Sequence, residues 1–77
     1  MRAAYELAFL YQGQGKVDAA EALYRRVLAR SADHFAAHFN LAILLEESGR
    51  SDEAARHYEQ AQQADSALWQ RVRGDTE

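Results

Sequence analysis

One stretch of the 77-residue chain decides the fold: LAFLYQGQGKVDAAEALY, residues 7–24. Its large apolar residues recur at steps of three and four on both sides of a break at residues 13–16, a spacing typical of two amphipathic helices. Leu7 and Leu10 belong to the buried stripe of the first helix, and Leu7 should pack on the returning helix. Gly15 suits the left-handed backbone that ends a helix, and Asp18 suits the first turn of the next helix. The stretch therefore predicts a helical hairpin.

The same pattern returns 34 residues later in the chain. Eight of the 34 aligned pairs are identical, and they fall where a helical hairpin needs a small, a large or a turn residue. The chain therefore contains an internal repeat. The identical pairs are Ala3/Ala37, Leu7/Leu41, Ala8/Ala42, Leu10/Leu44, Gly15/Gly49, Asp18/Asp52, Ala20/Ala54 and Tyr24/Tyr58.

The composition favours an all-α fold. The chain has no proline, four glycines and few β-branched residues, and 48% of its residues are hydrophobic. With no cysteine, disulfide scaffolds and thiolate metal sites are excluded. The net charge of −3 disfavours binding to nucleic acid, and no apolar run reaches the ~20 residues of a membrane span. The many arginines and alanines hint at a GC-rich, bacterial genome.

We expect one domain over residues 1–77, built from repeat one at 1–34, repeat two at 35–68, a capping helix at about 66–73 and a frayed tail at 74–77. The capping helix should carry Leu68, Trp69 and Val72 on one side and cover the helix that bears Tyr58. The expected helices span residues 2–14, 17–31, 35–48, 51–64 and 66–73.

A period of 34 residues with helix-turn-helix units resembles the tetratricopeptide repeat family. The resemblance covers residues 1–73 and implies a short right-handed α-solenoid. Three features depart from the family pattern, namely the lack of a bulky aromatic at Ala4 and His38, a leucine at position 45, and the lack of a terminal proline. Other α-hairpin repeats, such as the RNA-binding pentatricopeptide type, remain an alternative. The residues at the pattern positions are Ala4, Leu7, Ala8, Tyr11, Ala20, Tyr24 and Ala32, then His38, Leu41, Ala42, Leu45, Ala54, Tyr58 and Ser66, where Ala4, His38, Leu45, Ala32 and Ser66 are the departures.

Residues with chemical potential have simple structural explanations. His34 and His38 have the spacing of a zinc pair on one helical face, but no His-Glu-x-x-His motif accompanies them. We expect these histidines, and His57, to be structural or exposed, with no metal or cofactor bound. The serines lie at predicted caps and turns, and residues 13–16 lack the preceding strand of a phosphate loop. Asp33 should cap the helix at 35–48, and Asp65 with Ser66 should cap the helix at 66–73. An enzyme is not expected.

The resemblance implies a concave groove that receives a peptide or a partner helix. Tyr5 and Phe9 would line it from the first repeat, with equivalent residues in the second. The clamp that grips chaperone tails in this family is matched only at Asn40, so that ligand is not expected. The predicted groove residues are Tyr5, Phe9, Gln12, Phe39, Asn40 and Ile43.

These features predict a non-catalytic protein–protein interaction module in the cytoplasm, with a protein or peptide as partner. One alternative is a structural or self-assembling repeat unit whose groove is filled by a second copy, in a homo-oligomer, or by neighbouring repeats of a larger protein. An RNA binder or enzyme accessory is a third class. If the groove is not the site, the exposed arginine face around Arg25, Arg26 and Arg30 is the next candidate.

Overall fold

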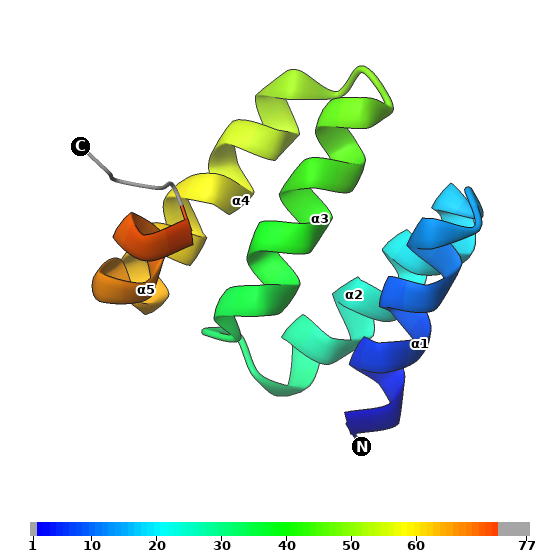
Figure 1. The fold of residues 1–77 in the computed structure, drawn as a ribbon, viewed down its shortest axis with the longest axis horizontal. Coiled ribbons are helices and arrows are strands. Elements are labelled where there is room, and N and C mark those ends of the chain that lie inside the picture. Colours follow the sequence, from blue (N-terminus) through cyan, green and yellow to red (C-terminus); the bar gives the residue numbers. More distant parts are fainter. Residues whose placement is uncertain (1, 73–77) are drawn as a thin grey trace.

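The computed structural model describes residues 2–72, which form five α-helices and no strand. The helices make two antiparallel hairpins followed by one short helix (Figure 1). All five helix bounds lie within one residue of those predicted, which confirms the all-α architecture. Residue 73 and the predicted tail at 74–77 lie outside the described residues. The helices are α1 (Arg2–Gly13), α2 (Val17–Arg30), α3 (Phe35–Glu47), α4 (Ser51–Ala64) and α5 (Ser66–Val72).

The two hairpin turns have the same geometry. Gly15 and Gly49 adopt φ angles of +80° and +82°, in the left-handed region that favours glycine. In the first turn the backbone N–H of Lys16 donates to the Tyr11 carbonyl, 2.9 Å away. In the second turn the backbone N–H of Arg50 donates to the Leu45 carbonyl, 2.8 Å away. The predicted role of Gly15 as the residue that ends a helix is confirmed.

The helix starts show one correction. The sequence predicts that Asp33 caps α3, but His34 does so, because its Nδ1 accepts a hydrogen bond of 3.0 Å from the backbone N–H of Ala37. At α5 the cap is the expected Asp65, whose Oδ1 accepts from the backbone N–H of Leu68 at 3.0 Å.

Small residues bring the helices of each hairpin together. The alanines that the repeat places at its close approaches are all buried, with at most 2% of their surface exposed. Large side chains fill the space between hairpins, in line with packing of small against large. The four alanines are Ala8, Ala20, Ala42 and Ala54, and the largest fully buried side chains are Tyr24, Leu41, Leu44 and Leu45.

Two leucines of α1 correct the predicted core. Leu7 was expected to pack on α2 and Leu10 to lie in the buried stripe, but 39% and 55% of their surface is exposed. Their equivalents in α3, Leu41 and Leu44, are 0% and 1% exposed. The difference arises because α3 packs beside the first hairpin, whereas no described helix lies on the corresponding side of α1.

The last helix lies against α4. The ring centroid of Trp69 is 5.8 Å from that of Tyr58 and 6.1 Å from that of Phe39. Trp69 therefore covers part of the end of the second hairpin. The predicted contribution of the Val72 side chain lies outside what the structure describes.

Candidate functional site

A tyrosine and an asparagine join the first helices of the two hairpins. The Asn40 Nδ2 on α3 donates a hydrogen bond of 2.7 Å to the Tyr5 hydroxyl on α1. The Tyr5 ring also lies 5.3 Å from the ring of His34 and 6.0 Å from that of Tyr24. Burial raises the pKa of the Tyr5 hydroxyl, with a smaller opposite effect from the Asn40 bond. The structure thus brings together two of the predicted groove residues.

Phe9 and Ile43 are equivalent residues on the same side of α1 and α3. Phe9 is 58% exposed, and Ile43 is half-buried. Phe9 follows Tyr5 by about one helical turn, so the two side chains share one side of α1. Of the four apolar groove residues predicted, Phe9 is largely exposed, and Tyr5, Phe39 and Ile43 are half-buried.

The other two predicted groove residues make contacts within the molecule. Gln12 Oε1 accepts a hydrogen bond of 2.7 Å from the Tyr24 hydroxyl. The ring of Phe39 stacks on Phe35 at 5.7 Å and meets Tyr58 at 5.8 Å. Gln12 therefore holds α2 on α1, and Phe39 belongs to the junction with α4 and α5.

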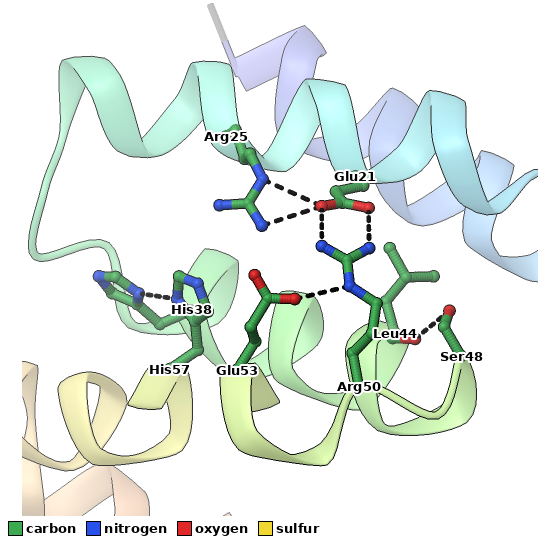
Figure 2. Close-up of polar contacts among 8 residues, drawn as sticks. All are labelled: Glu21, Arg25, His38, Leu44, Ser48, Arg50, Glu53 and His57. Atoms are coloured by element: carbon green, nitrogen blue, oxygen red, sulfur yellow. Dashed lines mark hydrogen bonds and ion pairs between the residues drawn. The ribbon is translucent and has the colours of Figure 1, made fainter. Parts of the chain in front are cut away.

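An ion-pair network, which the sequence did not predict, links the two hairpins (Figure 2). The Arg50 guanidinium, in the turn before α4, donates to both carboxylate oxygens of Glu21 on α2, at 2.8 and 3.0 Å. Its Nε donates to Glu53 at 2.6 Å, and Arg25 donates to Glu21 at 2.9 and 3.1 Å. Two arginines thus share the Glu21 carboxylate, which fixes the second hairpin against α2.

The network shifts the pKa values of its acids. The hydrogen bonds from Arg50 lower the pKa of Glu21, burial acts in the opposite direction, and the bond from Arg25 adds to the lowering. The bond from Arg50 also lowers the pKa of Glu53. Both carboxylates therefore stay charged near neutral pH, as the ion pairs require.

Two histidines form a second polar contact inside the second hairpin (Figure 2). His38 is 5% exposed, and its Nδ1 lies 3.1 Å from the Nδ1 of His57. The other ring nitrogen of His38 lies 2.7 Å from the carbonyl oxygen of Ala32. A carbonyl only accepts, so His38 carries its proton on Nε2, and His57 donates to the Nδ1 of His38. Burial lowers the pKa of His57, helped by His38 and Arg25. The expected structural role of His38 fits this geometry.

The ring nitrogens of His34 and His38 that face other groups make contacts within the molecule. The Nδ1 of His34 is occupied by its cap, and the ring nitrogens of His38 by Ala32 and His57. Within residues 2–72 there is no group of three or more histidine, aspartate or glutamate side chains arranged to hold a metal ion. No helix in that part of the chain has both the length and the hydropathy to cross a bilayer.

Comparison with known proteins identifies the family. No curated protein matches the chain. A family model described as tetratricopeptide repeat matches residues 5–68, which span both hairpins and extend into α5. The two hairpins from Tyr5 onward, their turns at Gly15 and Gly49 and the buried alanines fall within that match. The chain belongs to the tetratricopeptide repeat family.

Proposed function

We propose that the chain is a non-catalytic module that binds an apolar segment of a partner protein. Tetratricopeptide repeats typically act as non-catalytic modules for protein–protein interaction. The site is the side of α1 and α3 that carries Tyr5, Phe9, Asn40 and Ile43, named the α1–α3 face below.

The observation that carries this proposal is the incomplete burial of Ile43. Exposure of Phe9 alone has a simple explanation, because no described hairpin precedes α1. Ile43 occupies the equivalent position on α3, where a hairpin does precede, and it still stays half-buried. Stacking of hairpins therefore does not use this position, and an apolar residue placed there twice is better explained by binding.

The chemistry of the face favours an apolar segment with an accessible backbone. Phe9 and Ile43 supply apolar contact area, and Asn40 precedes Ile43 on α3 by about one helical turn. Asn40 uses one N–H for Tyr5, and an asparagine amide has a second N–H and a carbonyl oxygen for peptide groups. A short amphipathic helix across α1 and α3 suits this combination.

The experiment uses a peptide selected from a random display library on the wild-type chain and labelled for fluorescence anisotropy. We expect Phe9→Ala to weaken binding of this peptide at least about tenfold, as for an aromatic hot spot. Leu10→Ala is the matched control, because Leu10 is similarly exposed on another side of α1 and should keep the affinity within about twofold. Unchanged binding to Phe9→Ala, or no enriched peptide at all, contradicts the proposal.

A further inference from the structure

The α1–α3 face ends in negative charge at the C-terminal end of α3. Asn40, Ile43 and Glu47 follow one another at steps of three and four, so their side chains share one side of that helix. Glu47 is exposed, as is Glu46 beside it. The apolar contact area that Ile43 supplies is therefore bordered by carboxylates about one helical turn further along α3.

The contact that Glu46 makes within the molecule does not require its charge. The Glu46 Oε1 accepts a hydrogen bond of 2.9 Å from the Tyr58 hydroxyl. In the first repeat the neutral side chain of Gln12 accepts the same bond from Tyr24, at 2.7 Å. An amide is thus sufficient to join the two helices of a hairpin at this position, and the second repeat has a carboxylate in its place.

The place of both carboxylates is electrostatically unfavourable for α3 itself. The C-terminal end of a helix carries partial negative charge and favours basic residues, but the last turn of α3 contains none. The corresponding residues of α1, Gln12 and Gly13, are both uncharged. Neither the helix nor the repeat pattern therefore requires negative charge at Glu46 and Glu47.

The charges of Glu46 and Glu47 are not neutralised within the described part of the chain. Within residues 2–72 neither of them forms an ion pair. Arg50, the basic residue nearest to them in the sequence, is held by the network on α2 and α4 (Figure 2). Burial raises the pKa of the Tyr58 hydroxyl to about 12, and the charges of both carboxylates add to the increase. Both charges therefore act at one end of α3, in a chain whose net charge of −3 also attracts basic partners.

We propose that the partner segment is a basic amphipathic helix, whose apolar residues contact Phe9 and Ile43 and whose lysine or arginine pairs with Glu47. This inference rests on the proposed function and adds the charge of the partner to it. The ion pair lies at the rim of the contact, where charge determines the choice of partner and the rate of association more than the affinity. An apolar helix without a basic residue is disfavoured, because the carboxylates lose water and gain no cation.

The peptide selected from the display library tests the charge of the partner. We expect its sequence to carry a lysine or arginine within about one helical turn of its apolar residues. Glu47→Lys should weaken binding of this peptide at least about fivefold, and the effect should shrink between about 50 mM and 500 mM NaCl. Asp33→Lys is the matched control, because it makes the same change in net charge at an exposed residue before the other end of α3, and it should keep the affinity within about twofold.

A charge swap and a stability measurement separate binding from folding. A peptide whose basic residue is changed to glutamate should bind the wild type more weakly, and Glu47→Lys should restore its binding at least about threefold. In urea, Glu47→Gln should leave the free energy of unfolding unchanged or raise it, because the carboxylate opposes the dipole of α3.

The outcomes distinguish this inference from the proposed function. A selected peptide that depends on Phe9 but carries no basic residue overturns the inference and leaves the proposed function standing. The same holds if Glu47→Lys binds the peptide as tightly as the wild type, or if the charge swap restores nothing. A marked loss of stability in Glu47→Gln also overturns the inference, because the carboxylate then serves the fold. Unchanged binding to Phe9→Ala overturns both.

Discussion

Leu10 and Leu44 occupy the same repeat position, and truncating each one measures how much a neighbouring hairpin contributes. Leu44 is 1% exposed in the core, whereas Leu10 is 55% exposed on α1. The perturbation is leucine to alanine at each position. The same atoms are removed from the same place in the hairpin, so the difference between the two variants reports the environment alone.

The expected magnitudes follow from burial. Leu44→Ala removes a fully buried side chain and leaves a cavity, which lowers the free energy of unfolding by about 3 kcal/mol within a usual range of roughly 2–5 kcal/mol. Leu10→Ala removes a side chain that is already half in water, and alanine favours the helix slightly more than leucine. Its cost is therefore about 1 kcal/mol or less.

Urea unfolding followed by far-ultraviolet circular dichroism measures both values. The protein concentration should be low enough for the wild type to be monomeric, so that assembly does not stabilise it. We expect the midpoint temperature of Leu44→Ala to fall by roughly 12–24 °C in a parallel thermal scan, from about 4–8 °C per kcal/mol. Equal losses in Leu10→Ala and Leu44→Ala would refute the idea that α1 lacks the neighbour that α3 has.

Three further predictions concern the turns and the polar contacts. Gly15→Ala should lower the free energy of unfolding in urea by about 1–2 kcal/mol, because the position has a φ of +80°. Gly13→Ala should leave that free energy unchanged or raise it, because a Cβ added there meets no atom within 4 Å. Stability should fall as the pH drops below about 6.5, where an unfolded histidine takes up a proton that folded His57 resists because its pKa is lowered. His57→Asn should flatten this pH dependence, because the asparagine amide can still donate to His38 but does not titrate; an unchanged slope would exclude His57 as its source. Glu21→Gln should lower the midpoint temperature by a few degrees at low salt and by less in about 1 M NaCl, where charges are screened within ~3 Å; a salt-independent loss would count against the ion pairs.

Local features of the fold were predictable from the sequence. The helix bounds follow from apolar spacing, and the turns follow from Gly15 and Gly49, because both depend on residues near one another in the chain. The 34-residue repeat also predicts that the chain forms two hairpins of the same kind, one after the other. For the candidate site, the repeat pattern also places Tyr5 and Asn40 on the first helices of the two hairpins.

Contacts that depend on a neighbouring element were not predictable in this way. Leu10 and Leu44 are identical in sequence pattern, and only the hairpin beside α3 separates their exposures. The ring of Phe39, a predicted groove residue, lies 6.1 Å from that of Trp69 on α5, a contact that the repeat pattern does not reveal.

The contact between His38 and His57 is visible in the sequence only when the two repeats are compared. His38 and His57 are 19 residues apart, and in the first repeat their positions hold two apolar residues, Ala4 and Leu23. A paired change from apolar to histidine at two positions of one repeat indicates a contact. Comparing the repeats position by position would have found it.

The most direct test of the binding account is a map of backbone amide chemical shifts while the selected peptide is added to the ¹⁵N-labelled chain. The account predicts that the largest changes cluster at Phe9, Asn40 and Ile43 on the α1–α3 face. Changes that centre instead on the exposed arginines of α2, Arg26 and Arg30, with little effect at Phe9, would contradict it.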